Sequence, residues 1–176
     1  MKQKFTKIYL LIFTLLTLSC NNDDSKTKEQ SNFLKIENAE YELVNGISED
    51  YSDYPENDVY NIDLTFLTSE FTVDGNDYSG NGRSIGFEIF SSTPNKLPLG
   101  TYLYNSTQNP LSFAAAFIYD NSNGEDTEIE IISGTITITK SENNYYELTF
   151  KCVDEMNKTI TGRYFGNVNY VPNLLP

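Results

Sequence analysis

The 176-residue sequence contains no histidine and no tryptophan. Without histidine, Ser-His-Asp and Cys-His catalysis and histidine-ligated zinc or iron are excluded. Basic residues are also few, since 12 Lys and Arg stand against 25 Asp and Glu, for a formal net charge of -13. A chain of this charge repels other polyanions, so we expect no nucleic-acid partner.

The sequence also has no apolar run long enough to span a bilayer as a helix. The longest run, Ile8 to Leu18, covers about 11 residues, whereas a transmembrane helix needs about 20. Three lysines precede this run, and a small residue followed by Cys20 ends it. This pattern predicts that residues 1–19 form a signal peptide.

The residues that close the apolar run are Thr17-Leu18-Ser19-Cys20. They resemble a bacterial lipobox, although Thr17 and Leu18 depart from its commonest residues. The resemblance implies cleavage before Cys20 and covalent acyl chains, such as palmitate, on that cysteine, which would anchor the protein to a membrane. The alternative is an ordinary secretory signal in which Cys20 has no role, and it predicts a soluble exported protein.

A short acidic segment follows Cys20 and consists of Asn21, Asn22, Asp23 and Asp24. It resembles the export signal of Bacteroidota-type lipoproteins, which implies an outer-membrane location with the domain facing the cell surface. Within residues 20–32, the lipidated N-terminus is what the lipobox resemblance implies, and the polar composition that follows it predicts a flexible acidic tether, because it offers nothing to bury. The prediction of a flexible tether does not depend on whether the acidic segment is also an export signal.

Residues 33–176 alternate between apolar and polar side chains with a period of 2, as in Tyr60–Phe66 and Tyr145–Cys152. This period predicts an all-β, single antiparallel domain of about eight strands. Short turns between the last four strands predict an up-and-down meander. Both a small lipocalin-like barrel and a two-sheet sandwich satisfy the pattern. No lipocalin signature is present, so no residue role follows from that likeness.

Three further predictions concern single segments or residues of this domain. Gly46 to Asp58 is rich in acidic residues and is predicted to be an exposed loop. A β-bulge at Gly134 is expected, because strict alternation cannot place the isoleucines before and after it on one face. Cys152 lies on the apolar side of its strand, with Cys20 consumed by acylation, and is predicted to be a buried core residue rather than a nucleophile.

Two groups of residues are candidate binding sites. Tyr51, Tyr54 and Tyr78 fall in predicted loops and could stack on sugars, although most tyrosines in strands pack into a core. The loop containing Asp120, Ser122 and Asp126 offers oxygen atoms to calcium, although the same residue types are favoured by turns. Nothing supports a catalytic pair of carboxylates, so we expect a protein that is not an enzyme.

The sequence therefore predicts an outer-membrane lipoprotein with a non-catalytic binding or assembly role. Its ligand could be a glycan or another nutrient at the cell surface. The alternatives are a β-barrel that carries a small apolar ligand and a structural or adhesive partner of another envelope protein. Exposed tyrosines near amides favour the first, an unfilled interior the second and a flat apolar patch the third.

Overall fold

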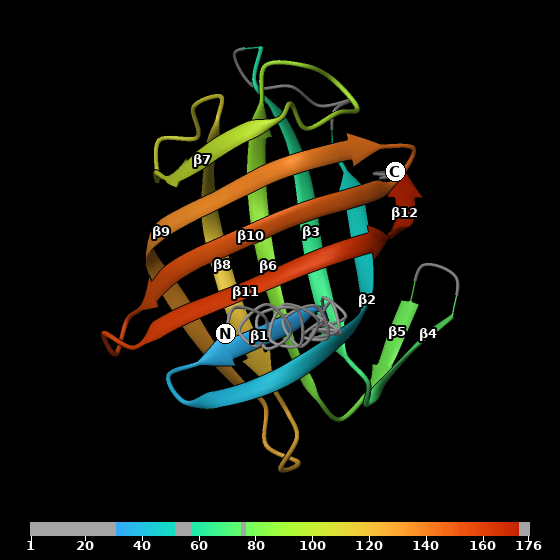
Figure 1. Cartoon of the computed structure of the whole chain (residues 1–176), viewed down its shortest axis with the longest axis vertical. Helices are drawn as coiled ribbons and strands as arrows, with labels where there is room; N and C mark the ends of the chain where they lie inside the picture. The colour runs from blue at the N-terminus through green and yellow to red at the C-terminus, as the bar shows by residue number, and fades with distance from the viewer. Residues whose placement is uncertain (1–30, 52–57, 75–76, 173–176) are drawn as a thin grey trace, which may run out of the picture. The chain divides into compact units, whose positions relative to one another are not determined.

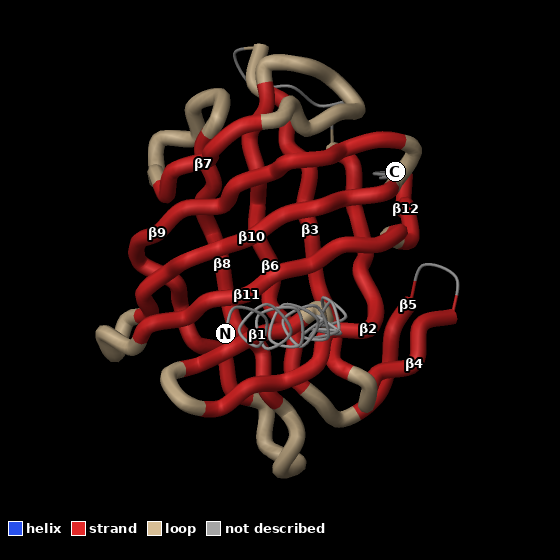
Figure 2. Tube along the Cα trace, viewed as in Figure 1, coloured by secondary structure: helices blue, strands red, loops and turns tan. Residues whose placement is uncertain are grey.

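The computed structural model describes residues 31–51, 58–74 and 77–172, and every regular element within them is a β-strand (Figures 1 and 2). The strands are β1 (Phe33–Ile36), β2 (Ala39–Asp50), β3 (Tyr60–Thr68), β4 (Phe71–Asp74), β5 (Asp77–Gly80), β6 (Arg83–Ser91), β7 (Gly100–Tyr104), β8 (Ser112–Asp120), β9 (Thr127–Glu142), β10 (Tyr145–Asp154), β11 (Thr159–Asn167) and β12 (Asn169–Pro172). The all-β prediction is confirmed.

Eight of these strands close into a barrel. Each pairs antiparallel with the next in the order β1, β2, β3, β6, β8, β9, β10, β11, and β11 pairs back with β1. The barrel is therefore the architecture that this sequence adopts, and the predicted meander is confirmed for β8 to β11. Closure leaves no long unpaired edge on this ring, which removes the template for aggregation that an open sheet presents.

β7 is a ninth strand, inserted where β8 and β9 separate. It pairs parallel with β8 from Leu103 and antiparallel with β9 from Gly100. β8 itself carries a register shift between Gly86 and Glu88 of its partner β6, and Ala115 within it has a φ of 38°. The bulge bends β8 and increases its twist, which accommodates the inserted strand.

The seam between β11 and β2 is closed by two short strands. β1 pairs with the first part of β2, and β12 pairs parallel with the last part, from Ile47 to Asp50. Gly46 lies between the two stretches, and a Cβ atom there would approach Val168 Cγ1 to 2.7 Å. A glycine therefore permits β2 to pass close to the β11–β12 connection.

A continuous apolar cluster fills the barrel. Every strand of the ring contributes to it, and Phe87 packs against both Phe113 and Phe150 with ring centroids 5.7 Å and 5.3 Å apart. Burial of each such side chain stabilises the fold by about 1.5–3 kcal/mol. A second, small cluster of Ile47, Leu67 and Phe71 lies apart from it, where the β4–β5 hairpin meets β2 and β3.

The structure corrects two local predictions, the first of which is the exposed loop from Gly46 to Asp58. Ala39–Asp50 is one strand, so the predicted loop from Gly46 begins only after Asp50; residues 52–57 lie outside the described part of the chain. Before this point the chain turns once, in the β1–β2 hairpin, with Glu37 at a φ of 54°. Strand count and loop limits depend on pairing partners, which local alternation does not contain.

The bulge in β9 is real but is displaced from Gly134. Two residues of β9, Ile132 and Thr139, have no partner in β10. After each of them, the face of β9 that points into the barrel is reversed. Gly134 serves another purpose: its φ is 145°, and a Cβ atom there would lie 2.6 Å from the Cys152 Cα. The isoleucine pattern indicated that a bulge was needed, whereas its position was set by the pairing with β10.

Candidate functional site

Four polar side chains line the inside of the barrel at one end. Ser48 and Asp50 come from β2, Ser141 from β9 and Tyr146 from β10, and all four are buried. The two β2 residues point inward because the register shift after Leu43 reverses the alternation of that strand. We call this group of four the barrel mouth.

Tyr146 joins the strands of the barrel mouth. Its hydroxyl forms hydrogen bonds with the side chains of Ser48 and Ser141. Burial raises the pKa of Tyr146 and the Asp50 carboxylate raises it further, against the two serine bonds that lower it. Asp50 in turn accepts a hydrogen bond of 3.2 Å from the Tyr170 hydroxyl. The mouth thus combines a buried group of three hydroxyls with the charge of the Asp50 carboxylate.

The connection between β6 and β7, residues 92–99, folds over the same end of the barrel. Ser91 Oγ lies 2.9 Å from the carbonyl oxygens of Thr93 and of Lys96, and it accepts the Thr93 N–H at 2.9 Å. Leu97 is fully buried, and the Tyr102 hydroxyl donates to the Pro98 carbonyl at 2.7 Å. These contacts hold the connection, and with it the Lys96 backbone, in a fixed position.

Two adjoining hollows open beside the barrel mouth. They lie between residues 92–99 and the β9–β10 turn, and both are lined by Lys96, Ser141 and Glu142. The first has a volume of about 500 Å³ and adds Leu99, Thr139 and Lys140. The second has about 440 Å³ and adds Asn95, Asn143, Asn144 and Tyr146. Both volumes fall within the range of small-molecule sites, which often occupy the mouths of β-barrels.

The chemistry of the hollows is that of a polar binding site. Amides, hydroxyls, a carboxylate and ammonium groups supply donors and acceptors from several directions. Leu99 adds an apolar surface, with 60% of its side chain exposed. Asn143 and Asn144 also have φ values of 49° and 64°, which asparagine tolerates better than most residues, so the turn itself favours them. The arrangement can hold a ligand rich in hydroxyl groups.

The structure does not bring the three predicted tyrosines together. Tyr51 follows β2 and is half-buried, with its N–H donating to the Asn61 carbonyl at 3.0 Å. Tyr78 is exposed on β5, beyond the opposite end of β3. Tyr54 lies outside the described residues. Tyr51 and Tyr78 therefore cannot form one stacking surface, and a role for either in ligand binding stays a prediction.

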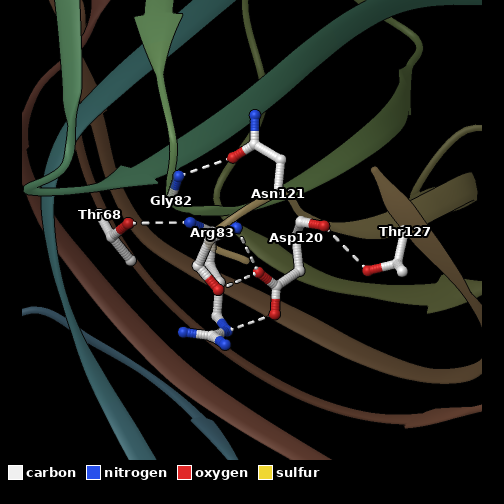
Figure 3. Close-up of polar contacts among 7 residues, drawn as sticks. Thr68, Gly82, Arg83, Asp120, Asn121 and Thr127 are labelled. Carbon is white, nitrogen blue, oxygen red and sulfur yellow. Dashed lines mark hydrogen bonds and ion pairs between the residues drawn. The ribbon is translucent and has the colours of Figure 1, made fainter. Parts of the chain in front are cut away.

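The predicted calcium loop is organised around an arginine (Figure 3). Arg83 Nε lies 2.7 Å from Asp120 Oδ2, while Asp120 Oδ1 accepts the Ser122 N–H at 2.9 Å and its hydroxyl at 2.6 Å. Asp126 instead acts on Tyr119, whose pKa is raised by burial and then by this carboxylate. Asp120 and Ser122 thus come together through a turn, and the positive charge beside them is the guanidinium. Calcium binding stays a prediction.

The backbone around this loop is also held by cross-strand bonds. Asn121 Oδ1 accepts the Gly82 N–H at 2.7 Å, and Thr68 Oγ1 accepts the Arg83 N–H at 3.0 Å (Figure 3). The Thr127 hydroxyl donates to the Asp120 carbonyl at 2.9 Å. These contacts stabilise the end of the barrel opposite the mouth.

Sequence reasoning missed the residues around the barrel mouth. Lys96 and Lys140 lie on separate elements, and Tyr146 reads as an ordinary core position of its strand. Only the Asn143-Asn144 pair gave a local signal, and it indicated a turn. Cys152 was placed correctly: it is fully buried, and burial raises the pKa of its thiol to about 12, which makes it unreactive.

No family model, no curated protein and no solved structure matches the chain. The residues expected to carry the lipid anchor and the export signal, Cys20 and Asn21 to Asp24, lie outside the described part of the chain. Among the described residues, no helix is long and apolar enough to cross a membrane.

Proposed function

We propose that the protein is a lipid-anchored lipoprotein of the outer membrane that binds glycans, without catalysis, in the two hollows beside the barrel mouth. The observation that carries this proposal is the pair of adjoining hollows that share Lys96, Ser141 and Glu142. Sugars present many hydroxyl groups, and the amides, hydroxyls and charged groups there offer matching donors and acceptors.

The filled interior of the barrel favours this site over an internal one. The inward side chains of β3, β6, β8 and β10 belong to one continuous apolar cluster, and Tyr102, Phe66 and Phe113 are fully buried within it. A carrier of a small apolar ligand needs an interior that is not occupied by its own side chains. A ligand is therefore better accommodated at the mouth than inside the barrel.

The binding test uses the chain from residue 21 onward, which contains every described residue and lacks the acylated cysteine. Glycans displayed on an array should retain the protein, and Glu142→Ala should weaken binding about tenfold, the loss of one charge-assisted hydrogen bond. Glu128→Ala is the matched control, because this exposed residue lies on the same strand near its other end. Absence of binding to every glycan would overturn the proposal.

The anchor is tested separately in cells. Cys20→Ala should abolish incorporation of a labelled fatty acid and leave the uncleaved precursor; normal acylation of this variant would exclude Cys20 as the anchor. For the export signal, residues 21–24 are replaced by alanine and intact cells are treated with protease. Unchanged accessibility of the barrel would show that this segment does not direct surface export.

A further inference from the structure

We infer that the glycan is acidic, with a sugar carboxylate bound by Lys96 and Lys140. This inference rests on the proposed function and names the class of ligand for the same two hollows. Three observations carry it: the charge of the first hollow, the lack of an ion pair between either ammonium group and a described carboxylate, and the contacts that hold the Lys140 side chain and the Lys96 backbone.

The charge of the first hollow is opposite to that of the protein, whereas the lysine and the glutamate in the lining of the second balance each other. Once the signal peptide with its three lysines is removed, nine basic residues remain against 25 acidic ones, a net charge of -16. The first hollow nevertheless has two lysines in its lining, Lys96 and Lys140, and one acidic residue, Glu142. A local positive charge on such an acidic surface indicates a site that selects an anionic group.

Within the described part of the chain, neither ammonium group forms an ion pair. Among the described residues, the basic side chain in an ion pair is Arg83, with Asp120. The Arg163 guanidinium contacts other groups than carboxylates: it lies near the Phe33 and Phe165 rings and donates a hydrogen bond to the Ser31 carbonyl. Lys96 and Lys140 form no ion pair with any described carboxylate. Lys140 stands across from Glu147 and contacts the Tyr145 ring, neither of which is an ion pair, so both ammonium groups can pair with an anionic ligand.

The Lys140 side chain and the Lys96 backbone are held before a ligand arrives. Ser91 Oγ lies 2.9 Å from the Lys96 carbonyl oxygen, which fixes the backbone of that residue. Lys140 is paired with Glu147 in the β9–β10 ladder, and its Nζ lies 4.8 Å from the centroid of the Tyr145 ring. Groups that are already held lose less conformational entropy when a ligand binds. We therefore expect one anion to be bound by both lysines.

The surroundings favour a uronic acid over a more densely charged polymer. The overall charge of -16 opposes nucleic acids and anionic lipid surfaces, whose charges are closely spaced. A uronic acid carries one carboxylate on a ring of hydroxyls. The lysines suit the carboxylate, while Asn95, Asn143 and Glu142 suit the hydroxyls.

The experiment compares oligosaccharides that differ only in their charge. Titration calorimetry of the chain from residue 21 onward uses digalacturonate, a disaccharide of alginate and glucuronoxylan fragments, which carry few carboxylates, each beside its methyl-esterified, neutral form. We expect at least one acidic form to bind about tenfold more tightly than its ester, the effect of one charge-assisted contact. The difference should largely disappear in about 0.5 M salt, which screens charges.

The lysine variants locate the effect. Lys96→Gln and Lys140→Gln should each reduce the ratio of the affinity for the acidic form to the affinity for the ester. Lys151→Gln is the matched control, since this exposed lysine of β10 removes the same charge away from the hollows. Equal affinity for acidic and esterified forms would overturn this inference and leave glycan binding intact. Absence of binding to every acidic and neutral oligosaccharide would overturn both.

Discussion

Asp63 of β3 lies directly opposite Glu88 of β6, and Glu49 of β2 is its partner on the other side. Three carboxylates thus stand in a row across neighbouring strands. Burial, followed by the charge of Glu88, raises the pKa of Asp63 to about 7; a hydrogen bond with Asn61 opposes this shift, and Glu49 adds to it. Burial also raises the pKa of Glu88, and the three carboxylates raise that of Tyr51 in addition to its burial.

This row predicts that the protein becomes less stable as the pH rises toward neutrality. The pKa of Asp63 is raised from 3.8 to about 7, so the folded state holds the proton more tightly than the unfolded state. Stability is therefore highest at low pH with respect to this group and falls between about pH 4 and pH 7. Asp63→Asn should raise the free energy of unfolding at pH 8 by about 2 kcal/mol, since residual solvent contact reduces the full effect.

Urea denaturation at pH 5 and pH 8 measures this effect. The gain from Asp63→Asn should be much smaller at pH 5, where the wild-type carboxyl is already protonated. Glu155→Gln, at an exposed position in the β10–β11 turn, should change stability at neither pH. An equal gain at both pH values would show that the carboxyl charge is not the cause.

Gly162 of β11 is predicted to be essential for packing. A Cβ atom there would overlap the Phe150 ring and lie 2.6 Å from the Phe33 carbonyl oxygen. Gly162→Ala should therefore lower the free energy of unfolding by about 1–3 kcal/mol through overpacking. Gly86→Ala is the control, because a Cβ atom there would make an ordinary 3.4 Å contact with Thr65 Oγ1. Thermal denaturation followed by circular dichroism compares the two, and equal stability would contradict the packing argument.

Arg83 is predicted to stabilise the end of the barrel opposite the mouth. It pairs with Asp120 at 2.7 Å, and its guanidinium lies 4.3 Å from the centroid of the Tyr41 ring. Both members of the ion pair are about four-fifths buried, with side-chain exposures of 23% and 21%. Arg83→Ala should cost about 1–2 kcal/mol at pH 7.

The pH dependence of this cost identifies its origin. Burial acts to raise the pKa of Asp120, but hydrogen bonds from Ser122 and the Arg83 charge outweigh it, so the pKa is lowered. The carboxylate therefore contributes stability at neutral pH that is lost as the pH falls through the range in which aspartates protonate. The difference between wild type and Arg83→Ala should shrink at about pH 3. A difference that did not depend on pH would assign the loss to the Tyr41 contact.

Tyr146 is predicted to stabilise the barrel mouth through its hydroxyl alone. Tyr146→Phe keeps the ring but leaves the buried Ser48 and Ser141 hydroxyls without this partner. The expected loss is about 1–2 kcal/mol in urea denaturation. The adjacent Tyr145→Phe is the control, because that hydroxyl donates to Glu147 on the outer face, at 3.2 Å. Equal losses in the free energy of unfolding would show that the buried hydroxyl of Tyr146 contributes no more to stability than the hydroxyl of Tyr145 on the outer face.

Most of the strands could be read from the sequence because a half-buried strand needs alternation. Ile62, Leu64 and Phe66 point inward as their period of 2 requires, and so do Leu148, Phe150 and Cys152. The candidate site could not be read in this way. Its parts come from β2, β9, β10 and the 92–99 connection, and register shifts in β2 and β9 decide which of their residues face inward.

The sequence by itself determined the all-β class, the final meander and the burial of Cys152, because each depends on local alternation and short turns. Tertiary structure decided that the sheet closes, since closure requires β1 to pair with both β2 and β11, strands more than 100 residues apart. It also decided that Lys96 and Lys140 share a hollow and that Asp63 faces two other carboxylates. These are relations between distant segments, and only the pairing of strands brings such segments together.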